Sequence, residues 1–305
     1  MRIGLQLDPR GQRDLASTLS AFAAAERDGF ASVWLGQVFE QDALTLLALA
    51  GTCTERIELG TSVVPLPTRH PTALAQQALT VQVATRGRLC LGVGSGHPAL
   101  LERKLGLPAD DVVGRTREAL AVLRPLLRGE HVVHEGRYQR LRVATPIAAP
   151  KPPPVLLAAL GPRMIALAAE LADGVSLVYA GAAFVARAVR PRLPARARIV
   201  ASLPVVVCDD AASARAAVDA YTGPSSRLPV YARVLAAQGA AHPSDVALVG
   251  DEARVEDGLE ALAASGVTDL NPILVHVDGE PGAARRTREW LAERARRRAR
   301  VRDLR

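Results

Sequence analysis

Short apolar segments alternate with amphipathic helical segments along most of this 305-residue chain, and this alternation constrains the fold more than any other feature. The predicted strands are residues 3–7, 32–35, 57–64, 88–93, 155–158, 174–178, 199–207 and 269–275. Helical periodicity follows most of them. Leu15, Leu19 and Phe22, for example, recur on one face of a helix predicted over residues 14–28. Strands that alternate with helices in this way form parallel sheets.

Eight strand–helix units favour an α/β fold in which the sheet closes into a single (β/α)8 barrel, the TIM barrel. A doubly wound open sheet is the alternative, but it would need a second domain to fill this length, and no linker divides the chain. Two segments interrupt the alternation. Residues 129–154, which contain VATPIAAPKPPP, are predicted to leave the barrel surface and return. Residues 211–251 form an insertion after strand seven.

The net charge of +7 is concentrated at the C-terminus, because residues 285–305 carry ten arginines and only three acidic side chains. We expect residues 1–284 to form the barrel and residues 285–305 to form a basic helix or tail packed on it or extending from it. A solvated helical face is the ordinary explanation of such a segment. Nucleic-acid binding is disfavoured, since aromatic residues make up only 3% of the chain and offer little base stacking.

Membrane and metal sites are not predicted either. No long segment is both uncharged and strongly apolar, as a membrane-spanning helix requires. The N-terminal MRIGLQLDPRG lacks the apolar run of a signal peptide. The three cysteines form no CxxC pair, which argues against zinc and is typical of a reducing compartment. The expected location is therefore the cytoplasm.

The active site of an α/β barrel lies at the carboxyl ends of its strands, which directs attention to the turns there. The turn LGVGSGH, residues 91–97, follows the fourth strand. It is not a dinucleotide-binding fingerprint, because His97 stands where the third glycine should be. Its glycines would still let the backbone approach a ligand closely. His97 is either an ordinary turn residue or a group that gives or takes a proton near neutral pH.

The turn ALGPRM, residues 159–164, follows the fifth strand and opens a helix. The free backbone N–H groups of that helix start, together with Arg163, could hold a phosphate; an ordinary strand–helix turn is the alternative. Asp42 and His70 are expected to cap helices. The sequence shows no Ser-His-Asp arrangement, no HExxH motif and no suitably spaced carboxylate pair, so hydrolysis by those routes is not predicted.

Three stretches of the chain, taken in order and spacing, resemble the luciferase-like flavin monooxygenase superfamily. More narrowly, they resemble its branch of oxidoreductases that use the deazaflavin coenzyme F420. The stretches are SVWLGQVFEQDALTLLALAGTCTERIELGTSVVPLPTRHPTALAQQALTVQVATRGRLCLGVGSGH, LGPRMIALAAELADGV and DVALVGDEARVEDGLEALAASGVTDL. The resemblance covers residues 1–274 and implies a barrel with an insertion after strand seven, a cofactor in the barrel mouth and a homodimer.

The resemblance also implies site residues. A non-prolyl cis peptide at Ser62–Val63 would back the cofactor ring, the strand-four turn would contact ring and substrate, and the Gly-Pro turn would hold the phosphate. The implied cofactor-binding residues are Gln37, Thr61, Ser62, Val63, Gly94, Ser95, Gly96, Leu160, Gly161, Pro162, Arg163 and Met164.

Two positions depart from the relatives. Gln37-Val38 replaces an Asp-His pair, and His97 replaces a glutamate found in relatives that oxidise sugar phosphates. We therefore predict His97 as the catalytic proton donor or acceptor and Gln37 as a polar contact, and we disfavour sugar-phosphate oxidation.

The leading hypothesis is an F420-dependent oxidoreductase that transfers a hydride between the deazaflavin and a small apolar substrate such as an enone, imine or ketone, in the direction of reduction. The predicted substrate walls are Leu7, Phe39, Leu66 and Tyr179. An FMN-dependent monooxygenase on the same barrel is the alternative. A basic groove leading away from the phosphate would favour F420, whose tail carries glutamates. A non-catalytic cofactor-binding protein is the third hypothesis.

Overall fold

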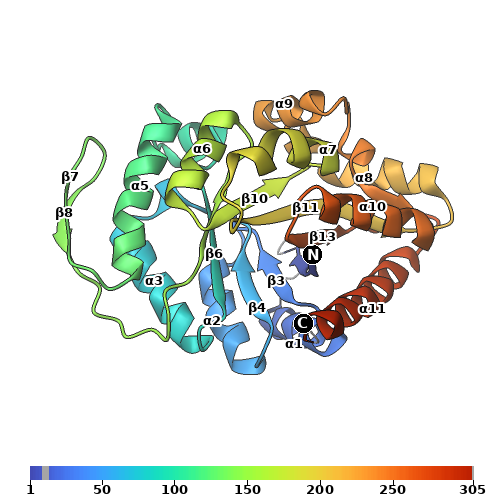
Figure 1. The fold of residues 1–305 in the computed structure, drawn as a ribbon, viewed down its shortest axis with the longest axis horizontal. Coiled ribbons are helices and arrows are strands. Elements are labelled where there is room, and N and C mark those ends of the chain that lie inside the picture. The colour runs from blue at the N-terminus through green and yellow to red at the C-terminus, as the bar shows by residue number, and fades with distance from the viewer. Residues whose placement is uncertain (9–13, 304–305) are drawn as a thin grey trace.

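The first strand pairs on both of its sides, and this closes the sheet into a barrel (Figure 1). In the computed structural model, which describes residues 1–8 and 14–303, that strand is split into β1 (Arg2–Ile3) and β2 (Leu5–Leu7). The others, in spatial order from β2 round to β1, are β3 (Ser32–Leu35), β4 (Glu58–Thr61), β6 (Leu89–Gly94), β9 (Val155–Ala158), β10 (Gly174–Val178), β11 (Arg198–Val207) and β13 (Asp269–Leu274). Every pair is parallel. The predicted (β/α)8 barrel is therefore confirmed.

Helices follow the strands, and several of them start at side-chain caps. The helices that follow the strands are α1 (Leu15–Asp28), α2 (Ala43–Cys53), α3 (Pro71–Ala84), α5 (Val112–Leu127), α6 (Pro162–Leu171), α7 (Ala182–Phe184), α10 (Glu252–Ala264) and α11 (Ala283–Asp303). The Asp42 carboxylate accepts a hydrogen bond from the Thr45 N–H at 2.8 Å. Nδ1 of His70 accepts one from the Thr72 N–H at 3.2 Å. Both residues are helix caps, as expected from the sequence.

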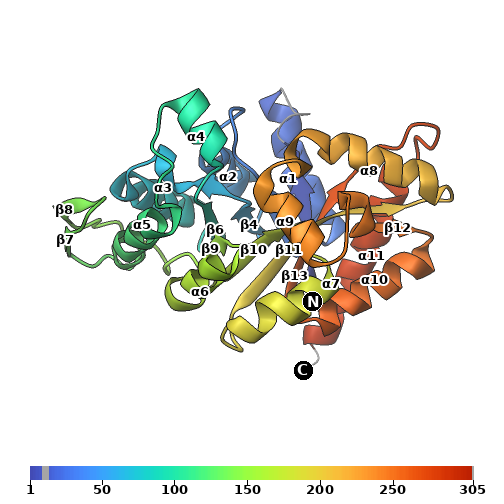
Figure 2. The ribbon, with the colours of Figure 1, turned by 90° about the horizontal axis from the view of Figure 1, so that it is seen from above.

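Both interruptions of the strand–helix alternation lie where the sequence places them. Between α5 and β9 the chain forms an antiparallel hairpin, β7 (Val132–Glu135) and β8 (Arg140–Val143), which stands beside α5 at the left of Figures 1 and 2. The hairpin itself was not predicted, because the prolines that follow it dominate the segment. The insertion after β11 contains α8 (Ala211–Ser226), α9 (Pro229–Ala237) and β12 (Leu248–Gly250), which pairs with the end of β11. A further short helix, α4 (Pro98–Leu105), follows β6.

Four charged side chains fill the barrel at the amino ends of its strands. Arg198 on β11 donates to the Glu58 carboxylate on β4 at 2.8 Å, although these strands are not neighbours, so the two side chains meet across the interior. Arg2 and Arg198 both bond the buried Asp269, at 2.6 and 2.9 Å. The cluster balances two positive charges with two negative ones, as a buried ionic group must.

An indole ring forms the layer above these charges. Trp34 is fully buried with Cys90, Leu156 and Val200. A Cβ atom at Gly60, on the neighbouring strand, would overlap the Trp34 ring, so a residue without a side chain is required there. The amino half of the barrel is thus packed solid, as in other α/β barrels, and only the carboxyl ends are open to a ligand.

Helix α11 packs along the barrel wall (Figure 1), and several of its arginines bond carboxylates there. Trp290 and Leu291 are buried in the main core. Beside this buried contact, Arg286 donates to Glu252 at 2.8 Å and Arg288 pairs with Asp28 at 2.7 Å. In the described part of α11, four arginines thus pair with carboxylates of the neighbouring helices α1 and α10. In the described part of the chain no helix is long and apolar enough to span a membrane.

Candidate active site

The turns that the sequence singles out lie side by side at the barrel mouth. Strands β3, β4, β6, β9 and β10 are consecutive in the sheet, so the residues that follow them share one edge. These residues are Gln37, Ser62–Val63, Gly94–His97, Leu160–Met164 and Tyr179. Because parallel strands all end at the same edge, sequence segments more than a hundred residues apart contribute to one site.

A bulge after β4 forms the back of the mouth. The Ser62–Val63 peptide bond is cis. The Ser62 N–H donates to the Leu35 carbonyl at 2.6 Å, which ties the bulge to β3. On the β6 side, the Thr61 hydroxyl donates to the Gly92 carbonyl at 2.7 Å, so this side chain is engaged within the barrel wall.

Glycines on β6 make room for this bulge. A Cβ atom at Gly92 would overlap the Thr61 carbonyl, and one at Gly94 would lie 2.7 Å from Cγ2 of Val63. The glycines of the LGVGSGH turn thus permit close approach of the β4 bulge. This is a packing reason for a motif that superficially resembles a nucleotide-binding loop.

The turn after β9 leaves an anion site open. Gly161 is the N-cap of α6 and makes no side-chain cap hydrogen bond. No heavy atom lies within 4 Å of the position a Cβ would take on Gly161. Pro162 and Arg163 follow, both exposed. A glycine N-cap, open space and an adjacent guanidinium are compatible with a bound phosphate, which stays a prediction.

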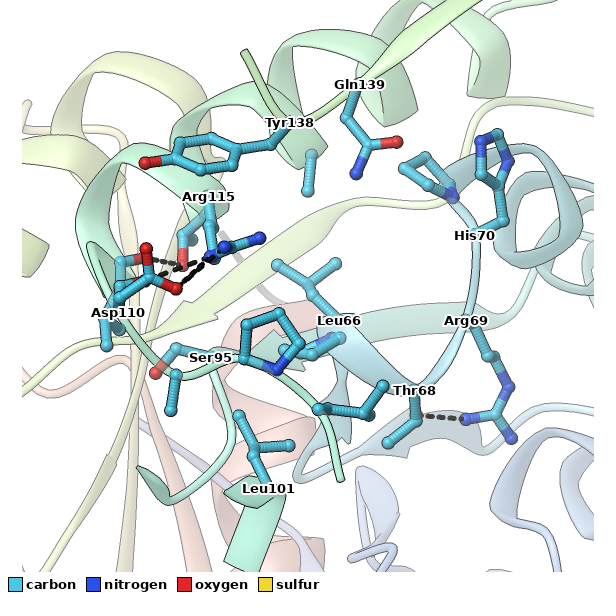
Figure 3. Close-up of a pocket in the computed structure, with 18 of the residues that line it drawn as sticks. Leu66, Thr68, Arg69, His70, Ser95, Leu101, Asp110, Arg115, Tyr138 and Gln139 are labelled. Atoms are coloured by element: carbon cyan, nitrogen blue, oxygen red, sulfur yellow. Dashed lines mark hydrogen bonds and ion pairs between the residues drawn. The ribbon is translucent and has the colours of Figure 1, made fainter. Parts of the chain in front are cut away.

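A cavity of about 500 Å³ opens beside the mouth (Figure 3). Its walls come from the turn before α3, from α4 and α5, and from the β7–β8 hairpin. The lining includes Leu66, Thr68, Arg69, His70, Ser95, Leu101, Asp110, Arg115, Tyr138, Gln139 and Arg140. Two of these, Leu66 and Ser95, were predicted site residues. The lining holds three arginines and one aspartate, and Arg69 and Arg140 pair with carboxylates just outside it, Asp42 and Glu135.

Arg115 lies between an aspartate and a tyrosine ring in this cavity. It donates to the Asp110 carboxylate at 2.7 Å, and its guanidinium lies 4.3 Å from the ring centroid of Tyr138 (Figure 3). The Tyr138 hydroxyl donates to Asp111 at 2.7 Å. Hydrogen bonds from Tyr138 and Gly114 hold the pKa of Asp111 below its usual range, and the charge of Arg163 contributes to this effect. The open turn of α6 is therefore within electrostatic reach of the cavity.

Gln37 is held at the rim of the mouth. Its side-chain oxygen accepts hydrogen bonds from the Ala43 N–H and from Arg69, each at 3.3 Å. Arg69 also pairs with Asp42. A side-chain hydrogen bond from Gln37 also helps to lower the pKa of Asp42, so Gln37 is tied into the Arg69–Asp42 pair at the rim.

His97 joins an aromatic cluster that spans three segments. Its Nε2 lies 3.1 Å from the hydroxyl of Tyr231 on α9, and the Tyr231 ring packs edge-on against Tyr179. Burial lowers the pKa of His97, so the imidazole is neutral at pH 7. Burial also raises the pKa of Tyr231 to about 12, with a contribution from Tyr179, so this phenol keeps its proton. The arrangement offers neutral hydrogen-bond donors rather than charges.

The predicted substrate walls separate into two groups. Leu7, Leu66 and Tyr179 are buried at strand ends or in the turn that follows. Phe39 is 52% exposed, with the Lys104 ammonium 5.3 Å from its ring centroid. Phe39 thus differs from the other three in its exposure, and the substrate role of all four stays a prediction. Among the described residues, no group of three or more His, Cys, Asp or Glu side chains could hold a metal ion.

Sequence reasoning missed Tyr231, Gln238 and Arg115. Tyr231 on α9 and Gln238 just after it are far along the chain from the turns they contact, whereas Arg115 is on α5. Tyr231 and Gln238 belong to the insertion, where the only signal was its length. Arg115 was placed in a helix, but nothing in the sequence indicated which face it occupies.

A family model for luciferase-like monooxygenases matches residues 2–269. A barrel with a cis-peptide bulge and an open Gly-Pro turn at its mouth is consistent with that match, and the chain belongs to the luciferase-like monooxygenase family.

Individual relatives cover only part of the chain. A Mycobacterium tuberculosis protein, provisionally named a coenzyme F420-dependent oxidoreductase, is 36% identical over 188 residues, which is 57% of this chain and 54% of that protein. An F420-dependent glucose-6-phosphate dehydrogenase of Beutenbergia cavernae is 38% identical over 176 residues, 53% of this chain and 51% of that protein. The chain thus spans about half the length of these relatives.

Solved structures share the fold over most of the chain. An F420-dependent secondary alcohol dehydrogenase in complex with an F420–acetone adduct has a TM-score of 0.77 at 19% identity, covering 89% of this chain and 92% of that one. The oxygenating constituent of 3,6-diketocamphane monooxygenase from Pseudomonas putida, in complex with FMN, has a TM-score of 0.72 at 19% identity, covering 96% and 97%. At these identities the likeness shows the barrel fold.

Proposed function

We propose that the chain is an F420-dependent oxidoreductase that transfers a hydride between the deazaflavin and a small apolar organic substrate. The F420-dependent relatives support the cofactor class. The arginine-lined cavity beside the mouth is the observation that favours F420 over FMN. F420 extends beyond its phosphate as an acidic tail, whereas FMN ends at its phosphate, so only F420 has a group for this cavity.

Each part of the mouth has a role in this proposal. The bulge at Ser62–Val63 backs the ring, the open start of α6 at Gly161 receives the phosphate, and Arg115 faces the acidic tail. When bound, F420 supplies or accepts the hydride. The neutral imidazole of His97 exchanges the accompanying proton, and the buried walls exclude water.

We further propose a carbonyl, imine or enone substrate, taken in the direction of reduction. Leu7, Leu66 and Tyr179 are mainly apolar, and a neutral His97 is suited to a hydrogen bond with a substrate oxygen or nitrogen. A sugar phosphate, the substrate in the name of the Beutenbergia cavernae relative, is disfavoured, because His97 stands in place of the expected glutamate.

The test is a pair of fluorescence titrations, one with F420 and one with FMN. We expect tight binding of F420 and weak binding of FMN. Arg115→Gln should weaken F420 binding about fivefold, as for loss of a partly exposed ion pair, and leave FMN unchanged. Arg117→Gln is the matched control, because Arg117 lies on the same helix and pairs outside the cavity with Glu170. Tighter FMN binding would favour the monooxygenase, and binding of neither would favour a non-catalytic barrel.

The role of His97 is tested separately. His97→Ala should lower turnover by about 100-fold and nearly preserve the affinity for F420, since a positioned acid–base group contributes that much. Unchanged turnover would reduce His97 to a turn residue.

We also propose that the protein is a cytoplasmic homodimer whose barrel and arginine-rich helix form one unit. The three free cysteines support a reducing compartment. Leu49 on α2 and Val83 on α3 are apolar yet 36% and 46% exposed, and these helices are neighbours, which supports an interface there. Light scattering coupled to gel filtration would test the dimer, with a monomer mass as the contrary result.

A further inference from the structure

We infer that Tyr231 is a positioning residue for His97: its hydroxyl holds the imidazole in one orientation and in the tautomer that carries its proton on Nδ1. The catalytic consequence rests on the function proposed above, whereas the tautomer itself is a property of the protein alone. Tyr231 lies on α9, in the insertion, and comes to the mouth from outside the strand ends.

The geometry is that of a directed hydrogen bond. The Tyr231 hydroxyl is 3.1 Å from Nε2 of His97. The two ring centroids are 5.3 Å apart at an interplanar angle of 72°, so the rings meet edge-on. This contact fixes the plane of the imidazole as well as its distance.

The direction of the bond is inferred from the contact together with the protonation states of the two groups. The phenol, with its pKa raised to about 12, keeps its proton and needs an acceptor in its half-buried position. Within the described residues, the His97 ring nitrogen is the hydrogen-bond partner found for this hydroxyl. A neutral imidazole has one bare nitrogen and one N–H. Nε2 is therefore the acceptor, and the proton that His97 can deliver to a ligand is the one on Nδ1.

The imidazole is not engaged in capping, which would be the ordinary use of a histidine at this place. His97 is the N-cap residue of α4, but its side chain makes no cap hydrogen bond. His70 provides the contrast, since it caps α3 through Nδ1. The side chain of His97 is therefore turned to Tyr231 and not to its own helix.

Both ends of α9 are anchored, which makes Tyr231 a rigid support. Gln238, just after the helix, donates to the Tyr179 carbonyl at 2.7 Å and accepts from the Gly181 N–H at 2.9 Å. Near its start, the Tyr231 ring packs against Tyr179 with centroids 5.4 Å apart. Tyr179 itself has a positive φ of 54°, a conformation that Gln238 helps to hold. The insertion therefore joins the turns after β6 and β10 through one tyrosine.

The test is imidazole 15N NMR of the full-length protein without cofactor, with the His97 signals assigned by their absence in His97→Gln. We expect Nδ1 to be protonated and Nε2 to be a hydrogen-bonded acceptor. In Tyr231→Phe, which keeps the ring contact, the Nε2–H tautomer should become substantially populated. Tyr221→Phe removes a hydroxyl from the same insertion that bonds Asp8 instead, and should leave the His97 tautomer unchanged. An Nε2–H tautomer in the unmodified protein would overturn the inference without any variant.

Kinetic measurements then test the positioning role of Tyr231 separately from the proposed F420-dependent activity. With F420 and a carbonyl substrate, Tyr231→Phe should lower kcat about tenfold, the size expected for loss of one orienting hydrogen bond, with KM and F420 affinity unchanged. A fall in F420 affinity without a change in kcat would refute the positioning role. Failure of the unmodified protein to bind F420 would refute the proposed function, while the NMR result would still decide the tautomer.

Discussion

The charge cluster at the closed end of the barrel allows a quantitative prediction for Asp269→Asn. The side chain of Asp269 is only 2% exposed, and it accepts hydrogen bonds from Arg2 at 2.6 Å and from Arg198 at 2.9 Å. Asparagine has the same shape, so no cavity forms. It removes one of two negative charges, however, and leaves two guanidinium groups facing Glu58 alone. Removing one partner of a buried ion pair lowers the free energy of unfolding by about 3–5 kcal/mol. We expect the lower end, about 3 kcal/mol, because the arginines reach solvent.

Urea denaturation followed by circular dichroism measures this loss. With a slope of about 3 kcal/mol per molar urea, a loss of about 3 kcal/mol lowers the midpoint by about 1 M. Glu170→Gln is the control, because it removes a carboxylate from an exposed pair with Arg117 and should leave the midpoint nearly unchanged. If both variants shifted the midpoint equally, the cluster would add no more than a surface pair, and the reasoning would be refuted.

Three further predictions concern the packing and stability of the barrel. Burial raises the pKa of Asp269, but the two flanking arginine charges outweigh it and hold the pKa below the usual range. Its contribution to stability is therefore complete above the unfolded-state value of about 3.9, and urea midpoints measured against pH should fall only when the pH drops below about 4. Gly60→Ala should lower the urea midpoint, with a cost of about 1–3 kcal/mol or more, because the new methyl group would overlap the Trp34 ring. Of the three cysteines only Cys53 is exposed, so a thiol reagent should label one thiol rapidly in the folded protein and all three after unfolding; rapid labelling of two would contradict the packing.

The fold was predictable because its signals are local. Each strand is a short apolar run, each helix repeats its apolar residues at a helical period, and parallel closure follows from their number. The strand-end turns were predictable for the same reason, since strand direction alone places Gly94–His97 and Gly161–Arg163 at one edge. The cis bond at Ser62–Val63 was implied by family resemblance, since no local propensity indicates it. The β7–β8 hairpin was missed, because a pattern of four-residue strands is weak beside a proline-rich run.

The contacts that orient His97 could not be predicted, because they join residues far apart in the sequence through helix faces. His97 and Tyr231 are 134 positions apart, and Tyr179 and Gln238 are 59 apart. Periodicity shows that a segment is helical but does not tell which turn of the barrel it will face. Only the docked position of the insertion brings these groups together, and that position depends on packing over the whole mouth.

The mouth is therefore built from two sources with different chemistry. The barrel strands supply the cis-peptide bulge at Ser62–Val63 and the open turn of α6, both made largely of backbone. The insertion supplies side chains: Tyr221 bonds Asp8 after β2, Tyr231 bonds His97 after β6, and Gln238 holds the turn after β10. Backbone sites tolerate sequence change and recognise what all cofactors of a class share, whereas side-chain contacts depend on single residues. Substitutions in the insertion should accordingly alter substrate choice and proton delivery before they alter cofactor binding.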